Sequence, residues 1–224
     1  MTKPKPEKKP LTEVVFILDR SGSMTGLESD TIGGFNSMLQ KQKDAKVRAF
    51  VSTVLFDHEA IVLHDRKKIE DVPLLTDKEY QPRGTTALLD AVGSAIKHIS
   101  TVHKYARAED RPTHTLFVIT TDGMENASRT YTVDKVKKMI EEQKSKYDWE
   151  FIFLGADIDA ISAAKRIGIE EECAVKYKKD KLGTILAFKS VGDVVCDCCM
   201  CEEERLPRNW KKEIEEDYIK RKNK

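Results

Sequence analysis

The sequence predicts a single α/β domain in which helices cover both faces of a mostly parallel sheet with one antiparallel edge. Two observations lead to this fold class. Short apolar runs alternate with longer segments of helical periodicity along most of the 224-residue chain. Two strand-like runs, 48–56 and 59–63, are separated only by Asp57 and His58, a connection too short for the crossover between parallel strands. A chain of this length suits one well-buried domain.

Continuous runs of β-branched, aromatic and leucine residues predict strands that are buried on both faces. Three such runs, residues 14–18, 114–120 and 150–154, are expected inside the sheet rather than at an edge. A last short strand is predicted at residues 173–177.

Helical periodicity predicts the connections between these strands. Apolar side chains recur on one face of residues 29–43, and Ser29 or Asp30 is expected to cap this helix. The other predicted helices are 86–100, 133–144 behind Thr132, 158–167 behind Asp157, and 182–195.

The two ends of the chain differ in composition from the domain, which is predicted over residues 11–201. Residues 1–10 hold three prolines and four lysines and predict a disordered basic arm. The charged tail, 202–224, spaces Leu206, Trp210 and Ile214 four residues apart. This spacing predicts a helix that docks a thin apolar stripe on the domain, with a partner-binding helix as the alternative.

The overall charge excludes several classes of partner. With 39 basic and 38 acidic side chains, the chain has no bulk attraction for nucleic acid or an anionic membrane. The first apolar run, 14–18, is too short for a signal-peptide core, and no window approaches the roughly 20 apolar residues of a membrane span. We therefore expect a cytoplasmic protein that binds neither nucleic acid nor membrane.

The cysteines do not form the spread pattern of a disulfide-stapled secreted domain. Cys173 stands alone, and the others are bunched at Cys196, Cys198, Cys199 and Cys201. Zinc sites usually use two separated pairs, so reduced thiols at a helix end are expected, with a soft-metal site shared between two chains as the alternative. The histidines at positions 58, 64, 98, 103 and 114 show no ligand spacing and are expected as surface or core residues.

Three segments rich in oxygen-bearing side chains each follow a predicted strand. They are D-R-S-G-S-M, P-R-G-T-T-A-L-L-D-A and V-I-T-T-D-G-M-E-N. Ligands bind at the carboxyl ends of strands in doubly wound sheets, so these segments are expected to form one pocket of three hydroxyls and two carboxylates. Such a pocket suits Mg²⁺, which takes about six oxygens at roughly 2.1 Å. The alternative is local structure, in which Ser21 and Ser23 cap a turn and Asp122 starts an ordinary one.

These segments resemble the metal-ion-dependent adhesion site (MIDAS) of the von Willebrand factor A (vWA) domain family. Asp19, Ser21 and Ser23 match its D-x-S-x-S triplet, and Asp122 in T-D-G matches its last motif. G-T-T-A-L-L-D-A is similar to the family's G-G-T-A-L-x-D-A, which selects Thr86 as the ligand and leaves Thr85 in place of a second glycine. The resemblance covers residues 11–195.

The resemblance implies a Rossmann-like, three-layer, doubly wound sheet of six strands with one antiparallel edge strand. It implies Mg²⁺ as the cation, with Mn²⁺ or Ca²⁺ as substitutes, and no catalytic residues. In such a site the hydroxyls are neutral ligands and the carboxylates often act through water, so an Asp or Glu of a partner protein can complete the metal's shell. Stand-alone cytoplasmic chains of this family occur widely in bacteria and phages as adaptors, and we expect a monomer or a weak homo-oligomer.

Two other functions are alternatives to a metal-dependent protein-binding module. A Mg²⁺-dependent phosphoryl-transfer enzyme needs an acid two residues after its nucleophilic Asp, but Ser21 stands two residues after Asp19. Neither a Walker lysine loop nor G-x-S-x-G is present. The other alternative is a structural vWA domain with an unused metal site.

Several other residues near the three segments have expected roles in local structure. Capping explains Asp157 and Asp159 better than chemistry does, and Asp57 also lies at a strand end. Met24, Gly26 and Arg83 are expected to shape or flank the site.

Overall fold

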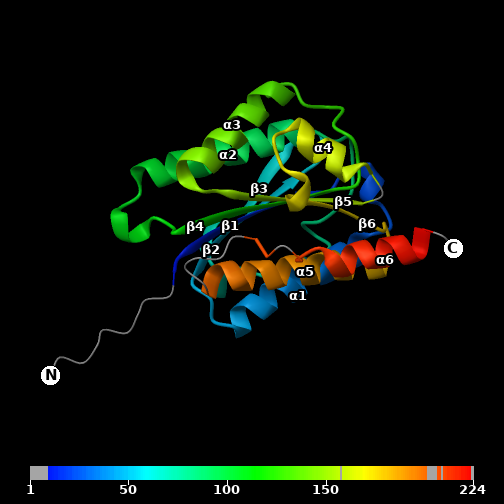
Figure 1. Cartoon of the computed structure of the whole chain (residues 1–224), viewed down its shortest axis with the longest axis horizontal. Helices are drawn as coiled ribbons and strands as arrows, with labels where there is room; N and C mark the ends of the chain where they lie inside the picture. The colour runs from blue at the N-terminus through cyan, green and yellow to red at the C-terminus, as the bar shows by residue number, and fades with distance from the viewer. Residues whose placement is uncertain (1–9, 157, 201–205, 208, 223–224) are drawn as a thin grey trace.

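Six strands form one sheet in the order β3-β2-β1-β4-β5-β6 in the computed structural model, which describes residues 10–156, 158–200, 206–207 and 209–222 (Figure 1). Strand β3 pairs antiparallel with β2, and the other neighbours are parallel. The predicted hairpin is therefore confirmed, and the three continuous apolar runs lie in the interior strands β1, β4 and β5. The strands are β1 (Thr12–Asp19), β2 (Ala49–Phe56), β3 (Ala60–Lys68), β4 (His114–Thr121), β5 (Glu150–Ala156) and β6 (Ala174–Tyr177).

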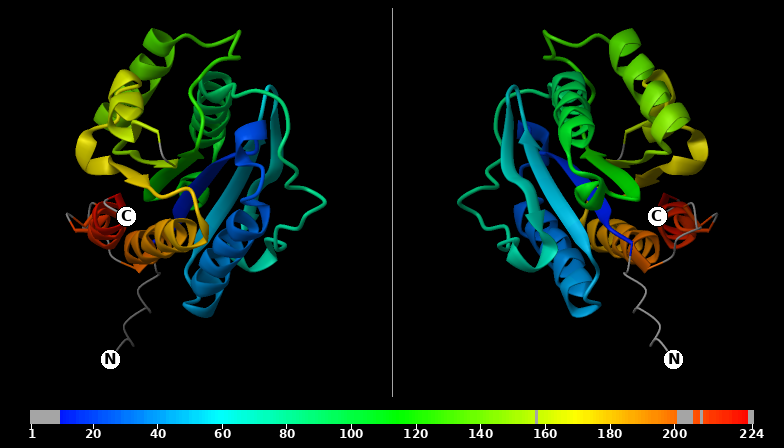
Figure 2. Two further views of the ribbon diagram at one scale, coloured as in Figure 1. Left: turned by 90° about the vertical axis from the view of Figure 1, so that its right-hand side faces the viewer. Right: turned by 90° about the vertical axis from the view of Figure 1, so that its left-hand side faces the viewer.

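Helices cover both faces of the sheet, so the predicted three-layer α/β architecture is confirmed. One face carries α1, α5 and α6, and the other carries α2, α3 and α4 (Figure 2). The helices are α1 (Glu28–Asp44), α2 (Leu88–Tyr105), α3 (Val133–Tyr147), α4 (Ala160–Arg166), α5 (Lys181–Met200) and α6 (Lys212–Lys222).

The alternation of side chains along β1 explains why its apolar run is continuous. Val14, Phe16 and Leu18 fill the core under α1 and α5, whereas Val15 and Ile17 fill the core under α2 and α3. All five are fully buried. A strand with helices on both faces needs apolar residues in both directions.

The start of α1 differs from the prediction that Ser29 or Asp30 caps it. The helix begins at Glu28 after Leu27, and no side chain caps it. Leu27 is buried in the core and anchors the helix entry there. Asp30 lies in the first turn, where its negative charge interacts favourably with the positive end of the helix dipole.

Two other predicted helices begin later than their sequence pattern indicates. Helix α2 begins at Leu88, because the backbone of Ala87, with φ −96° and ψ 58°, is not helical. The backbone N–H of Thr86 donates to Asn126 Oδ1 at 3.0 Å and that of Ala87 to Asp57 O at 2.8 Å. Helix α4 begins at Ala160, and its cap is Asp159, which accepts from Ser162 N at 3.2 Å. Asp157 lies outside the described residues. Thr132 caps α3 as predicted.

Helix α5 continues through the cysteine run instead of ending before it. Cys196, Cys198 and Cys199 are buried free thiols, and Cys201 lies outside the described residues. Burial raises the pKa of Cys198 and raises that of Cys199 to about 11. Burial thus favours the protonated form of these two thiols. The metal-free state of the cysteine run stays a prediction.

The apolar stripe of the tail docks on the domain, as predicted. Trp210 and Ile214 are buried in the core under α5, with Leu206 packed beside them. The indole N–H of Trp210 donates to Glu172 O at 2.9 Å. Residues 1–9 of the predicted basic arm lie outside the described residues.

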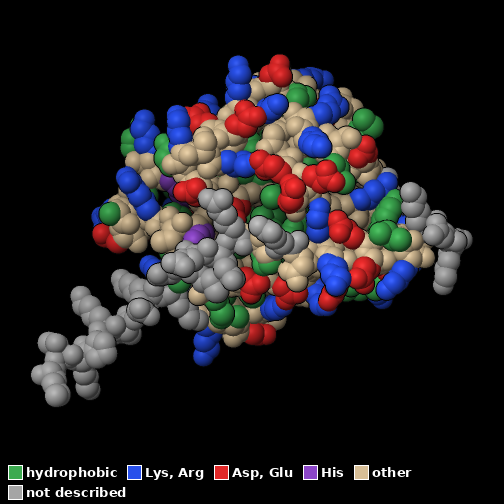
Figure 3. All heavy atoms as spheres, viewed as in Figure 1, with side chains coloured by type: hydrophobic (Ala, Val, Ile, Leu, Met, Phe, Trp, Pro, Cys, Tyr) green, Lys and Arg blue, Asp and Glu red, His purple; other side chains and the backbone are tan. Residues whose placement is uncertain are grey.

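The surface carries both signs of charge. Lysine and arginine alternate with aspartate and glutamate over the face shown in Figure 3, as the near-zero net charge leads one to expect. Within the described ranges, no helix combines the length and apolarity that crossing a bilayer requires.

Buried His64 on β3 makes the stability of the domain depend on pH. Its Nδ1 lies 3.0 Å from Thr53 Oγ1, and burial, reinforced by the charge of Lys67, lowers its pKa to about 4. The unfolded chain, with a pKa near 6.5, binds the proton more tightly, so stability present above pH 6.5 is lost as the pH falls toward 4. We expect a loss of about 2 kcal/mol by pH 5 from this residue.

Urea unfolding at pH 7, 6 and 5 measures this effect. The His64→Gln variant should lose most of the pH slope. The control is His98→Gln, which replaces an exposed histidine paired with Asp65 and should keep the slope. Equal slopes in His64→Gln and the unmodified protein would contradict the assignment.

Candidate metal centre

The three oxygen-rich segments converge where the strand order of the sheet reverses. Strand β1 lies between β2 and β4; the chain leaves β1 through α1 toward β2, and it leaves β4 through α3, on the opposite face, toward β5. The loop after β1, the loop after β4 and the start of α2 therefore meet at one edge. This is the position at which open α/β sheets bind ligands.

Asp19, the last residue of β1, forms the buried floor of the site. Its Oδ1 accepts from Ser21 N at 2.7 Å and its Oδ2 from Thr121 Oγ1 at 2.5 Å. Its own carbonyl oxygen accepts from the hydroxyl of buried Tyr80 at 2.5 Å. Burial raises the pKa of Asp19 and the charge of Asp122 adds to this, while the hydrogen bonds from Thr121 and Ser21 oppose it.

The two serines form a path from this floor to the solvent. Ser21 precedes the short 3-10 helix η1 (Gly22–Met24) and is buried, and Ser23 lies within it and is exposed. Ser21 Oγ and Ser23 Oγ lie 3.0 Å apart, and Ser23 Oγ donates to Asp122 Oδ1 at 2.5 Å. The D-x-S-x-S triplet and Asp122 thus form one connected set of oxygens.

Thr86 completes this set, and Thr85 does not. Thr86 is buried and Thr85 is exposed. A Cβ built on Gly123 would lie 2.9 Å from Thr86 Oγ1 and 3.4 Å from Ser23 Oγ, so both hydroxyls face the same point beside Asp122. All five residues predicted as metal ligands are therefore brought together at this edge.

Acidic and amide side chains that sequence reasoning missed hold the loop after β4 against α2. Glu125 accepts from Leu89 N and Ser128 N, and Asn126 exchanges hydrogen bonds with the backbone of Thr86. Asp90, inside L-L-D-A, accepts from the backbone N–H groups of residues 129–131. The clustering of acids in D-G-M-E-N was the available signal.

Asp57 organises the opposite side of the site. Its buried carboxylate pairs with Arg20 Nε at 3.1 Å and with Arg83 Nε at 2.9 Å, and it accepts from Glu59 N. Burial opposes ionisation, but these partners together lower the pKa of Asp57. Arg83 N also donates to Arg20 O at 2.8 Å, so Arg83 flanks the site as predicted.

The donor set fits a small hard cation. Two adjacent ligands of an octahedral Mg²⁺ at roughly 2.1 Å lie about 3.0 Å apart, which is the separation of the two serine hydroxyls. Asp122 Oδ2 is buried and accepts no hydrogen bond from the described hydroxyls or backbone N–H groups, so its pairing is with a cationic group, the ammonium of Lys179 at 2.8 Å. Among the described residues, no three or more His, Cys, Asp or Glu side chains lie close enough together to hold a metal ion by themselves. Metal binding at this edge would therefore depend on the hydroxyls.

The edge also attracts a positive charge from the chain itself. Lys179, between β6 and α5, places its Nζ 2.8 Å from Asp122 Oδ2 and donates to Ser23 O at 2.5 Å. No local pattern in the sequence indicated this residue.

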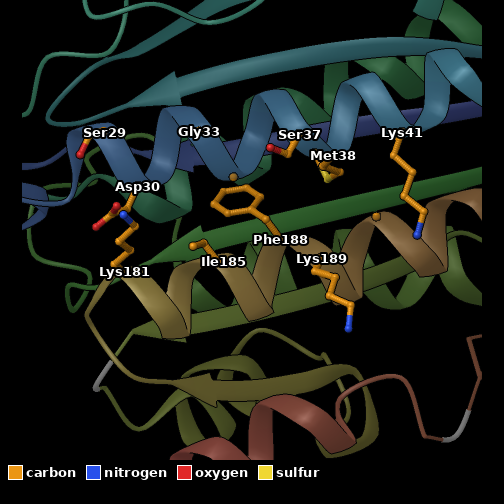
Figure 4. A pocket seen from close by; sticks show the side chains of 12 residues that line it. Ser29, Asp30, Gly33, Ser37, Met38, Lys41, Lys181, Ile185, Phe188 and Lys189 are labelled. Atoms are coloured by element: carbon orange, nitrogen blue, oxygen red, sulfur yellow. The ribbon is translucent and has the colours of Figure 1, made fainter.

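A groove between α1 and α5 is separate from this site. It has a volume of about 570 Å³, and none of the five predicted ligands lines it (Figure 4). Phe188 of α5 packs on Gly34 of α1, with Ile185, Lys181 and Lys189 along the α5 side. We interpret the groove as the surface furrow left where α1 and α5 pack against each other.

Solved structures with the same fold share little sequence with this chain. The vWF domain of the type V pili tip protein Mfa5 from Porphyromonas gingivalis has a TM-score of 0.60 at 11% identity, covering 88% of this chain and 99% of that one. Proximal thread matrix protein 1 from the mussel byssus, with a zinc-occupied MIDAS motif, has a TM-score of 0.62 at 13% identity over 84% and 48%.

The PilB minor pilin from Streptococcus sanguinis has a TM-score of 0.62 at 11% identity. The match covers 87% of this chain and 63% of the pilin, so the chain corresponds to less than two thirds of that protein. No protein-family model matches the sequence, and no curated protein matches it significantly. The comparisons therefore show a vWA-like fold.

Proposed function

We propose that this domain binds a protein partner through a divalent cation held by Asp19, Ser21, Ser23, Thr86 and Asp122. The observation that carries the proposal is the convergence of three hydroxyls and two carboxylates on one sheet edge. Mg²⁺ is the proposed cation, and the proposed ligand is an Asp or Glu carboxylate of the partner. The resemblance to a MIDAS and the zinc-occupied MIDAS named for the mussel protein support this reading.

The charge of the site suits this role. Ser21, Ser23 and Thr86 offer neutral oxygens, and Asp19 is already engaged by Thr121 and by the backbone of Ser21. A bound divalent cation supplies positive charge and an exchangeable ligand position that an incoming carboxylate can take. Exposed Ser23 marks the side from which a partner can approach.

The protein-binding role has indirect support from the kinds of protein that share the fold. A pilus tip protein, a minor pilin and a byssus matrix protein are named among them. At 11–13% identity these likenesses establish the fold alone, so the partner, the bacterial or phage type and the cytoplasmic location stay predictions.

Two measurements test the proposal: the binding of metal ions and the metal-dependent capture of partner proteins. Titration calorimetry with Mg²⁺, Mn²⁺ and Ca²⁺ should give binding to one site per chain. Partners captured on immobilised domain in Mg²⁺ should elute with EDTA and rebind when Mg²⁺ or Mn²⁺ is restored. In the partner, one Asp or Glu should be indispensable, and Asn or Gln should replace it poorly because the amide lacks the compensating charge.

The same preparation separates this proposal from a phosphoryl-transfer enzyme. We propose that the domain is not an enzyme, because Ser21 stands where such an enzyme needs an acid, and in the described part of the chain the Asp19 carboxylate accepts its hydrogen bonds from Ser21 N and Thr121 Oγ1. Hydrolysis of p-nitrophenyl phosphate in Mg²⁺ buffer, abolished by Asp19→Asn, would favour the enzyme. Absence of any cation binding would favour a structural domain.

A further inference from the structure

Lys179 brings a positive charge to the oxygens assigned to the cation. Its Nζ lies 2.8 Å from Asp122 Oδ2, and its ammonium donates to the carbonyl oxygen of Ser23 at 2.5 Å. The Asp122 side chain is fully buried, whereas 32% of the Lys179 side chain is exposed. The lysine therefore reaches in from the rim and neutralises the inner carboxylate.

The backbone beside Lys179 is held by contacts of its own. A Cβ on Gly183 would lie 2.1 Å from Lys178 O, so only glycine lets the start of α5 pack this closely on the loop. Asp180 accepts from Gly183 N at 2.9 Å and pairs with Arg221 of α6. These contacts fix where the side chain of Lys179 begins.

Two lysines that precede Lys179 lie against the docked tail helix. The ammonium groups of Lys176 and Lys178 lie 5.1 and 4.9 Å from the centre of the Tyr218 ring on α6. These neighbours of Lys179 thus point to the tail, whereas Lys179 alone of the three contacts Asp122 and Ser23. The arrangement aims one particular lysine at the site.

An ammonium and a divalent cation cannot share these oxygens without strong repulsion. Both would lie within contact distance of Asp122, and like charges this close in a partly buried site repel. Asp122 Oδ2, which lies 2.8 Å from Nζ, is also the oxygen of Asp122 that accepts no hydrogen bond from the described hydroxyls, so both cations would use the same atom. Binding of one cation therefore requires the other to withdraw.

We propose that Lys179 is a tethered competitor of the divalent cation, which holds Asp122 in the metal-free domain and swings out when the metal binds. This inference rests on the proposed function, since it concerns the same site. A competitor reduces the apparent affinity by the fraction of molecules in which the site is open. If Lys179 occupies the site in about nine of ten molecules, removing it raises the affinity about tenfold.

Titration calorimetry with Mn²⁺ and Mg²⁺ on the full chain tests this inference. Lys179→Met removes the charge and keeps a similar length, and it should bind about tenfold more tightly than the unmodified protein. The matched control is Lys178→Met, which removes the same charge one residue away and should change affinity by less than about twofold. Circular dichroism verifies that both variants fold.

The possible results separate this inference from the proposed function. Equal or weaker binding by Lys179→Met, with measurable binding by the unmodified protein, overturns the competition alone. Binding by neither protein overturns both proposals. Tight binding by Lys179→Met alone supports the competition and shows that the unmodified site is blocked.

A measurement on the unmodified protein avoids any effect of substitution on folding. Acylation of lysine amines, followed by mass spectrometry, should be faster at Lys179 when saturating Mg²⁺ is present, because its ammonium then leaves Asp122. Lys178 serves as the internal reference and should not change. Unchanged reactivity of Lys179 in a sample that binds Mg²⁺ overturns the inference.

Discussion

Replacing Asp19 by alanine is expected to weaken Mg²⁺ and Mn²⁺ binding by about 10- to 100-fold and to abolish metal-dependent partner binding. Asp19 is the deepest oxygen ligand in the proposed site, and it also holds the loop of Ser21 and the end of β4 through its two oxygens. Losing it therefore removes negative charge and releases the neighbouring ligands at the same time. Calorimetry with Mn²⁺ and a binding assay in Mg²⁺ measure the two effects.

The domain should stay folded in this variant, because its stability rests mainly on the two apolar layers of the sheet. The matched control is Asp65→Ala, which removes an exposed aspartate on β3 paired with His98 and should leave cation binding unchanged. A partner whose affinity is insensitive to both EDTA and Asp19→Ala binds through another surface, and the adhesion-site mechanism then fails for that interaction.

Replacing Asp57 by asparagine is expected to lower the free energy of unfolding by about 3–5 kcal/mol, the usual cost of removing one partner from a buried ion pair. The carboxylate is fully buried and lies 3.1 Å from Nε of Arg20, whose side chain is only 8% exposed. Without the charge of Asp57, the buried Arg20 guanidinium would lack compensation. Arg83 is largely exposed and should contribute much less.

Urea unfolding at pH 7 measures this loss. The control is Asp65→Asn, whose exposed pair with His98 should be worth less than about 1 kcal/mol. A loss below about 1 kcal/mol for Asp57→Asn as well would show that solvent compensates Arg20. Cation affinity should also fall in Asp57→Asn, because Arg20 directly follows Asp19 and its carbonyl holds Arg83.

The regular part of the fold was predictable from the sequence because its signals are local. The uninterrupted apolar run in β1 is typical of a strand buried on both faces, and the connection between β2 and β3 is too short for a crossover between parallel strands. Where helices begin was predicted less well. Ahead of α2, the non-helical backbone of Thr86 and Ala87 is held by hydrogen bonds to residues far away in the sequence.

The same division applies to the candidate site. The five predicted ligands could be found because each stands in a short motif, after β1, after β4 or just before α2, and the structure brings them together. Thr121, Tyr80 and Lys179 could not be found in this way. Each contacts a ligand residue from a distant segment, and only the sheet order and the docking of α5 place them there.

The hydrogen bonds that join the ends of β1 and β4 have a consequence for folding. Thr121 and Asp19 are 102 residues apart, and Ser23 and Asp122 are 99 apart. An unfolded chain therefore has no such site, and a cation that binds there binds the native state only. Ligand linkage then stabilises the native state by about 2.7 kcal/mol at a concentration one hundred times the dissociation constant. The melting temperature of the domain should accordingly rise with Mg²⁺ concentration, so that thermal unfolding itself becomes a partner-free assay of the site.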